Sequence, residues 1–236
     1  MLTSRLHRKT RRSAKHPLAG ILRDRRGVSA VEFALIAPLM LTIFTGMAVV
    51  ATGIMTKQHV SEATEGVGDI LTEQTQLQTT DMANMFSAGG YIMQPYSSTP
   101  MSMRVTEIYY APSTYSAGGM VAWSCATGTL SPYSYNQKFT TVPGTSGPIS
   151  NVLWVNNASA AGMTFITVES SYAFNSPASW FLSGLTTMTS QFAVEPRTAN
   201  YIGFPYTPGT TPTAPIATTK SNSVTLSNGA VCNYGS

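Results

Sequence analysis

The sequence is poor in charged residues, histidine and cysteine. Charged residues make up 10% of its 236 residues, and it contains three histidines and two cysteines. His59 is the only histidine after residue 27, so a Ser-His-Asp or Cys-His arrangement in that part would depend on a single imidazole. Sequence motifs such as H-E-x-x-H, the P-loop and the EF-hand loop are also missing. We therefore expect no enzyme, no metal site and no cofactor.

The net charge of +4 is an average over two unlike parts. Residues 1–27 hold nine of the fourteen Lys and Arg residues and one of the ten acids, so this leader carries a charge of +8. The other 209 residues carry a net charge of −4. A strongly basic chain would suggest a nucleic-acid ligand. Because the positive charge is confined to one terminal segment, we expect no nucleic-acid partner.

A long apolar run follows the basic leader. Residues 33–55 are 23 residues without a charged side chain. As a helix this run would be about 34 Å long, enough to cross the bilayer core of about 30 Å. The alternative is a buried helix of a soluble protein, but such a helix usually shows a polar stripe. The run predicts a membrane-spanning helix at residues 28–56.

The flanking charges predict the orientation of this helix. Nine basic residues precede it, whereas Lys57 is the one base close behind it and acids follow. By the positive-inside rule the N-terminus stays in the cytoplasm and the C-terminal part crosses the membrane. A secretory signal cut near residues 49–51 is the alternative, although the apolar run is longer than a usual signal core.

The start of the apolar run has the spacing of a processing site. Gly27 ends the leader, Glu32 stands five residues later, and Phe33 begins the uncharged run. This pattern resembles type IV prepilins, in which a membrane aspartyl peptidase (prepilin peptidase) cuts after the glycine. The resemblance implies cleavage between Gly27 and Val28. A glycine suits such a cut because it has no side chain to keep the peptidase from the backbone.

Glu32 lies where a carboxylate is costly unless something compensates its charge. Cleavage after Gly27 would give Val28 a free α-amino group, and residues 28 and 32 are i and i+4 on one helix face. The pilin resemblance implies that Glu32, beside Phe33, neutralises the amine of a neighbouring subunit during assembly. The alternative is that Glu32 only marks the polar edge of the span.

Residues 27–39 are similar to the start of the TadE/TadG-like proteins of the tight-adherence (Tad, Flp) pilus system. The chain reads GVSAVEFALIAPL where these proteins typically read G-x-x-A-V-E-F-A-L-x-x-P. Pro38 belongs to this pattern and predicts a kink, which a membrane helix tolerates. The resemblance implies a minor pilin or pseudopilin whose partners are the prepilin peptidase, other pilins, pilus assembly proteins and inner-membrane lipid. It leaves the TadE, TadF and TadG subtypes open.

Beyond the membrane segment, the sequence predicts more helix. Residues 57–88 form a helical extension, with Val60, Thr64, Val67 and Leu71 on one stripe. Gly66 and Gly68 weaken this stretch and offer a place for a bend. Thr79-Thr80-Asp81 provides an N-cap for a short second helix at residues 82–87.

Alternating apolar residues then predict an exported β-rich domain at residues 89–204. The expected strands lie at 103–110, 121–125, 165–174 and 191–195. The predicted fold class is α+β, with a long N-terminal transmembrane helix followed by a pilin-like antiparallel β-sheet domain. Residues 205–236 are expected to form a Thr/Pro-rich C-terminal tail.

Cys125 and Cys232 are the only cysteines. In an oxidising, exported compartment an even number of cysteines favours a disulfide. This bond would connect the tail to the second predicted strand. The alternative is two unpaired thiols.

Three functional hypotheses follow from the sequence. The first is a minor pilin, anchored in the bacterial inner membrane with a periplasmic C-terminal domain, that is built into or helps to assemble an extracellular pilus. The second is an uncleaved, membrane-anchored envelope assembly factor. The third is an exported adhesin, released after an ordinary signal peptide and acting in cell adhesion.

Overall fold

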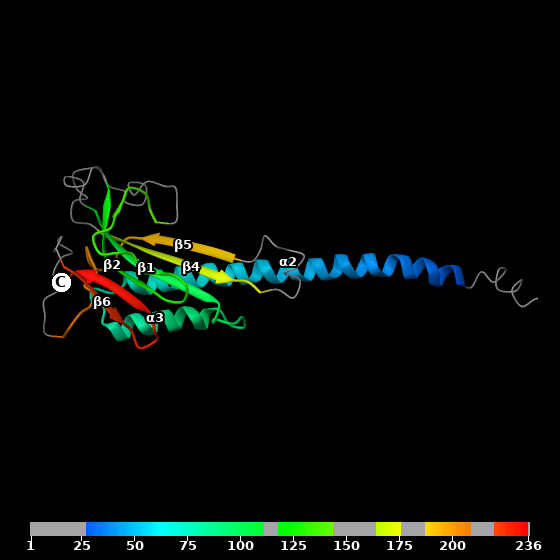
Figure 1. Cartoon of the computed structure of the whole chain (residues 1–236), viewed down its shortest axis with the longest axis horizontal. Coiled ribbons are helices and arrows are strands. Elements are labelled where there is room, and N and C mark those ends of the chain that lie inside the picture. The colour runs from blue at the N-terminus through cyan, green and yellow to red at the C-terminus, as the bar shows by residue number, and fades with distance from the viewer. Residues whose placement is uncertain (1–26, 111–117, 144–163, 176–186, 209–219, 236) are drawn as a thin grey trace, which may run out of the picture. The chain divides into compact units, whose positions relative to one another are not determined.

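The structure, a computed structural model, describes residues 27–110, 118–143, 164–175, 187–208 and 220–235 (Figure 1). The chain divides into two compact units, Met1–Ala48 and Val49–Ser236. Helices and one antiparallel sheet make up the described parts, so the predicted α+β class is confirmed.

The first unit contains the N-terminal part of a long helix, α2 (Val28–Thr72). This helix begins directly after Gly27, and Pro38 lies inside it without interrupting it. A proline leaves one helix carbonyl without its usual N–H donor. The kink expected at Pro38 stays a prediction.

The second unit uses the rest of α2 as part of its core. The predicted stripe of Val60, Thr64, Val67 and Leu71 is buried. The helix also continues through Gly68, where a Cβ atom would overlap the ring of Phe192. The glycine thus allows close packing between this helix and a strand, a role that helix propensity alone does not suggest.

Helix α3 (Thr79–Ile92) is longer than the short helix expected at residues 82–87. Its N-cap is Gln78, not a residue of the predicted Thr79-Thr80-Asp81 cap, because the Asp81 carboxylate accepts a hydrogen bond of 3.0 Å from the Gln78 backbone N–H. This arrangement is a capping box, which satisfies donors at both positions. The helix continues through Gly89, where a Cβ atom would lie 2.9 Å from Met103 Sδ. Tertiary packing therefore favours glycine at a position where propensity does not.

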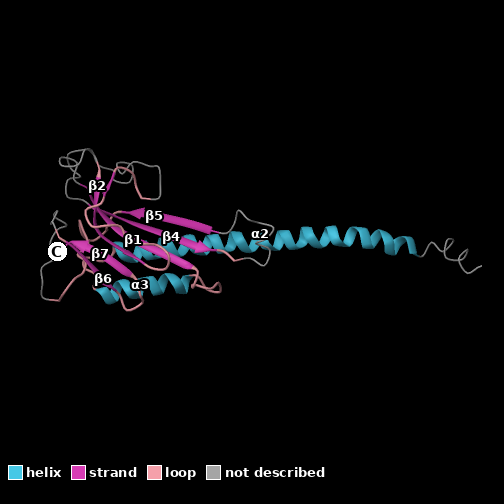
Figure 2. Ribbon diagram, viewed as in Figure 1, coloured by secondary structure: helices cyan, strands magenta, loops and turns pink. Residues whose placement is uncertain are grey.

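In the parts of the chain that the structure describes, seven antiparallel strands form one sheet, drawn in magenta in Figure 2. The order is β5-β4-β1-β2-β7-β6, with β3 also paired to β2. Four of them overlap the predicted strands: β1 (Met101–Tyr110), β2 (Gly119–Ala126), β4 (Thr164–Ala173) and β5 (Thr187–Val194). The sequence did not predict the other three: β3 (Lys138–Phe139), β6 (Ser221–Thr225) and β7 (Val231–Gly235).

The two strands β6 and β7 fall in the segment expected to be a tail. They form a hairpin in which the Leu226 N–H donates to the Ala230 carbonyl over 2.8 Å. Gly229 in the turn has a φ of 82°, a conformation that favours glycine. Strand β7 pairs with β2, so the hairpin extends the sheet.

One hydrophobic core joins both helices of the second unit to the sheet. The largest fully buried side chains include Trp123, Ile166, Leu71 and Met82. Every residue of β2 is buried. An alternating sequence pattern marks only the face of a strand that packs on the core, so it could not predict this burial on both faces.

Candidate functional site

The bond predicted to be cleaved lies at the N-terminus of α2. Gly27 is exposed, and no atom beyond its chain neighbours lies within 4 Å of the position of a Cβ on this residue, among the described residues. Val28, the first helical residue, is 54% exposed. The described part of the chain therefore leaves the Gly27–Val28 bond accessible. Its cleavage stays a prediction.

Glu32 and Phe33 lie one helical turn after Val28. Both side chains are exposed, Phe33 by 72%. Within the described residues, the Glu32 carboxylate takes part in no ion pair or hydrogen bond. The amide N–H groups of the first helical turn have no partner inside the helix and give this end a partial positive charge. Glu32 lies beyond this first turn, and its carboxylate remains open to a cation from outside the chain.

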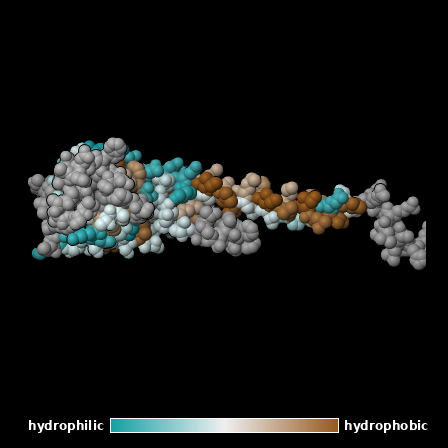
Figure 3. All heavy atoms as spheres, turned by 90° about the horizontal axis from the view of Figure 1, so that it is seen from above, coloured by the Kyte–Doolittle hydropathy of each residue, from teal (hydrophilic) through white to brown (hydrophobic). Residues whose placement is uncertain are grey.

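The side chains that follow Glu32 form an apolar helix surface (Figure 3). Within the described residues, α2 is the one helix that is long and apolar enough to cross a membrane, and almost none of its most apolar stretch is buried. The exposed apolar residues of the first unit include Leu35, Ile36, Leu39, Met40, Leu41, Ile43, Phe44 and Met47. Such a surface is consistent with a single membrane anchor.

The polar side chains of this apolar segment are satisfied within the helix. The Thr42 hydroxyl donates to the Leu39 carbonyl over 2.8 Å, and the Thr45 hydroxyl donates to the Leu41 carbonyl over 2.7 Å. In a bilayer an unsatisfied polar group would be costly. These internal hydrogen bonds therefore make the two threonines compatible with lipid.

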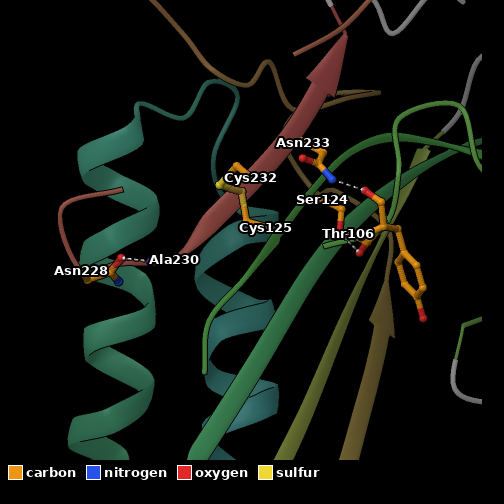
Figure 4. The surroundings of a disulfide bond; sticks show 8 residues. Thr106, Ser124, Cys125, Asn228, Ala230, Cys232 and Asn233 are labelled. Atoms are coloured by element: carbon orange, nitrogen blue, oxygen red, sulfur yellow. Dashed lines mark hydrogen bonds between the residues drawn. A yellow bond between two sulfur atoms is a disulfide. The ribbon is translucent and has the colours of Figure 1, made fainter. Parts of the chain in front are cut away.

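Cys125 and Cys232, the two predicted disulfide partners, form a disulfide between β2 and β7 (Figure 4). They are directly opposite each other in the antiparallel pair, with a Cα–Cα distance of 4.0 Å. Nearby, the side-chain amide of Asn233 donates to the Tyr133 carbonyl over 3.1 Å. The disulfide and this hydrogen bond hold the C-terminal hairpin to the centre of the sheet.

A buried carboxylate, Glu107, was not singled out from the sequence. It is fully buried in β1, where Oε1 accepts hydrogen bonds from the Ile202 backbone N–H (2.7 Å) and the Thr164 hydroxyl (2.9 Å). Burial raises the pKa of Glu107 to about 7, although the two hydrogen bonds lower it. The sequence signal is that Glu107 continues the alternating series Met103-x-Val105. A carboxylate in such a series points toward the core.

A second carboxylate, Glu169, is paired. Its two oxygens accept hydrogen bonds from Arg104 Nε and Nη2, at 2.8 and 2.9 Å. The two residues are opposite each other on β1 and β4, and the Arg104 guanidinium lies 3.7 Å from the ring centroid of Tyr133. This bidentate pair connects β1 with β4 and positions the loop that contains Tyr133.

The predicted site residues thus fall into two groups. Gly27, Val28, Glu32, Phe33 and Pro38 lie at the start of α2, whereas Cys125 and Cys232 belong to the sheet. Among the described residues, no group of three or more His, Cys, Asp or Glu side chains is placed to hold a metal ion. The two groups have different chemistry: an exposed junction followed by an apolar surface, and a covalent link inside a folded domain.

Residues 27–67 match the family model described as TadE-like protein. The match begins at Gly27 and contains Glu32, Phe33 and Pro38, so the resemblance predicted from the sequence is confirmed over this segment. It indicates a function related to the Tad pilus and an association with pilus components. No curated protein and no solved structure matches the chain.

Proposed function

Given the TadE-like match of residues 27–67, we propose that this protein is a minor pilin or pseudopilin that acts in assembly of a Tad (Flp, type IV-like) pilus. The observation that carries the proposal is the combination, in one matched segment, of an accessible glycine, an unpaired glutamate and an exposed apolar helix. The role is structural, without catalysis.

In this proposal α2 anchors the protein in the bacterial inner membrane. The basic leader stays in the cytoplasm and the sheet domain lies in the periplasm, as the positive-inside rule favours. The exposed apolar side chains contact lipid before assembly and the apolar helices of other pilins after it. Packing then replaces lipid contacts with contacts between subunits.

Prepilin peptidase cleaves the chain after Gly27 in this proposal. The new amine of Val28 carries a positive charge at the N-terminus of α2, where the helix dipole disfavours it. A carboxylate supplied by Glu32 of a neighbouring subunit compensates this charge. The pairing sets the axial position of one helix against the next, because a displaced helix would leave both charges uncompensated in an apolar environment.

The mature N-terminus tests the cleavage step. Mass spectrometry of the purified membrane fraction should find a protein that begins at Val28. Gly27→Val should leave the leader attached, since a branched side chain obstructs the peptidase. The matched control is Gly46→Val. Among the described residues, no atom outside the neighbouring backbone of its own helix lies within 4 Å of a Cβ position on Gly46, and this residue lies away from the junction.

Other N-termini would contradict the proposal in different ways. An intact Met1 in the wild-type protein would favour the uncleaved assembly factor. A start near Thr52 would favour an exported protein released by an ordinary signal peptidase. Normal cleavage of Gly27→Val would show that the peptidase does not require the glycine.

A second experiment separates cleavage from assembly. Glu32→Ala should be cleaved at the same bond and yet abolish piliation, measured by electron microscopy and by the amount of pilin in sheared fractions. The control is Glu73→Ala, which removes an exposed acid in the second unit. Piliation of Glu32→Ala at the wild-type level would contradict the pairing role of Glu32.

A further inference from the structure

An open pocket of about 560 Å³ lies in the second unit, at the C-terminal end of α3. Its walls come from α3, the segment 94–98, the start of β1, and two turns that contribute Thr127 and Asn228. Figure 4 shows Asn228 against α3, where its side-chain amide donates to the Ala83 carbonyl over 3.3 Å. The volume is within the range of about 300–1,000 Å³ that is typical of ligand pockets.

The pocket has an apolar floor and a polar rim. Phe86, Met101 and Met103 at the floor are less than 9% exposed. The exposed lining residues are Ser87, Tyr91, Gln94, Ser97 and Ser98. Tyr91 is 72% exposed, and its ring presents an uncovered apolar surface beside these polar groups. A ligand that fits must have both an apolar face and several hydrogen-bonding groups.

Several polar groups of the rim are available to such a ligand. Within the described residues, the side chains of Gln94, Ser98 and Thr127 make no hydrogen bond. Their amide and hydroxyl groups each donate and accept. A ligand hydroxyl, which also donates and accepts, can pair with them in either direction.

Local packing fixes the shape of the pocket before a ligand arrives. The ring of Tyr96 packs edge-on against His59, with 5.4 Å between the ring centroids. The Asn228 side-chain oxygen accepts a hydrogen bond from the Ala230 N–H, which orients its turn. A Cβ at Gly90 would lie 3.3 Å from Ser98 Cβ, so the absence of a side chain lets the rim segment approach α3.

No residue of the pocket lining is charged. A phosphate, carboxylate or ammonium group would lose its hydration there without gaining a counter-charge, so the lining favours a neutral ligand. A peptide could add to a free strand edge. However, at the floor Met101–Met103 of β1 pair with β4 on one side, and on the other side the Met103 carbonyl already accepts a hydrogen bond of 2.8 Å from the Thr127 N–H, so this carbonyl is not free for a peptide.

We propose that this pocket binds a short neutral oligosaccharide. Sugar rings have C–H faces that stack on an aromatic side chain, and Tyr91 provides one at the entrance. Their hydroxyl groups pair with the amide and hydroxyl groups of Gln94, Ser98 and Thr127. This binding activity does not depend on cleavage after Gly27 or on assembly into a pilus.

The test uses the full chain in a detergent that carries no sugar headgroup, because a glycoside detergent would compete for the pocket. An array of neutral and acidic oligosaccharides identifies a ligand, and isothermal titration calorimetry with that neutral sugar gives the Kd. Tyr91→Ala should weaken binding about tenfold or more, since it removes both the stacking contact and the apolar area of the ring. Tyr91→Phe keeps the ring and should stay within about threefold of wild type. The matched control is Asn84→Ala, an exposed α3 residue outside the pocket, which should leave the Kd unchanged.

Three outcomes would overturn the proposal. The first is an array on which no neutral oligosaccharide binds, or on which acidic sugars alone bind. The second is an unchanged Kd for Tyr91→Ala. The third is binding of an uncharged peptide that neutral sugars do not displace, which would assign the pocket to a peptide.

Discussion

The two parts of α2 use apolar residues in opposite ways. Up to Ala48, the large apolar side chains are mainly exposed: Leu41 is 66% exposed and Phe44 is 73% exposed. In the second unit, Val60, Val67 and Leu71 of the same helix are completely buried. The first part also has no charged residue after Glu32, whereas Lys57, Glu62, Glu65 and Asp69 accompany the buried stripe.

This difference shows that one helix has two sources of stability. The second part is stabilised by burial against the sheet, at about 25 cal/mol per Å² of apolar surface. The first part hides little of its apolar surface within the chain, so it needs a lipid bilayer or another subunit. Substitutions in the two parts should therefore have separable effects on folding of the domain.

Removal of the disulfide should cause the largest loss of stability in the second unit, which is called the domain below. Cys125→Ala combined with Cys232→Ala should lower the free energy of unfolding of the domain by about 4 kcal/mol, because the bond closes a loop of 107 residues. Urea titration of the full chain in micelles, followed by tryptophan fluorescence, measures this loss. The helical circular dichroism of the apolar segment should persist after the domain unfolds. A variant as stable as the wild-type protein would contradict the proposed stabilising role of the disulfide.

A matched pair of leucines tests the comparison within α2. Leu71→Ala should destabilise the domain by about 3 kcal/mol through the cavity that it leaves. Leu41→Ala makes the same chemical change at an exposed position and should leave the unfolding midpoint of the domain unchanged. Equal losses in the two variants would show that the two parts are not independent.

Glu107 gives the domain a pH dependence that the apolar segment lacks. Its pKa is raised by burial from 4.5 to about 7, so the folded state holds the proton more tightly than the unfolded state. The contribution of protonated Glu107 to the stability of the domain is then fully present below pH 4.5. It is lost as the pH rises through 7, which lowers the free energy of unfolding by on the order of 2–3 kcal/mol. Glu107→Gln should remove this slope in urea titrations from pH 4 to 8. The control, Glu73→Gln, should retain it.

Two glycines provide the smallest expected effect. Gly68→Ala should lower the stability of the domain by about 1 kcal/mol, because overlap with the Phe192 ring outweighs the better helix propensity of alanine. Among the described residues, the Cβ of Gly46→Ala meets no atom within 4 Å outside the neighbouring backbone of its own helix, and this change should not lower the stability. Thermal unfolding of both variants in the same micelles shows whether each substitution raises or lowers the stability of the domain. A rise in the melting temperature of Gly68→Ala would show that Phe192 moves away at little cost.

The sequence predicted those parts of the fold that depend on local pattern. The uncharged run predicted the long helix, and alternating residues such as Ile166 and Val168 predicted central strands. Long-range contacts decided the rest. Strand β6 is short and polar, and its pairing with β7 places it in the sheet. Helix α3 runs through Gly89 because Met103 and Val67 pack there, which no local rule includes.

The candidate site was predictable for a similar reason. Gly27, Glu32 and Phe33 lie within seven consecutive residues, so their spacing is visible in the sequence. In the sequence, Glu107 resembles the other acids, apart from its alternation with Met103 and Val105. Its burial in the core depends on the register of β1 in the sheet. The pocket is even more difficult to predict from the sequence. Its lining comes from α3, a loop and two turns, and it includes a residue as distant in the chain as Asn228.

The place of β7 in the sheet has a consequence for the timing of export. Strand β2 lies between β1, which is near it in the sequence, and β7, which is distant. Cys232 of β7 follows Cys125 of β2 by 107 residues. In the proposed orientation, residues closer to α2 reach the periplasm earlier. The Trp123–Ala126 part of β2, which pairs with β7, then has an unpaired backbone edge until residues 231–235 emerge. Such an edge invites pairing with other chains. Pairing of β7 with β2 covers this edge, and the Cys125–Cys232 bond then fixes the pairing covalently.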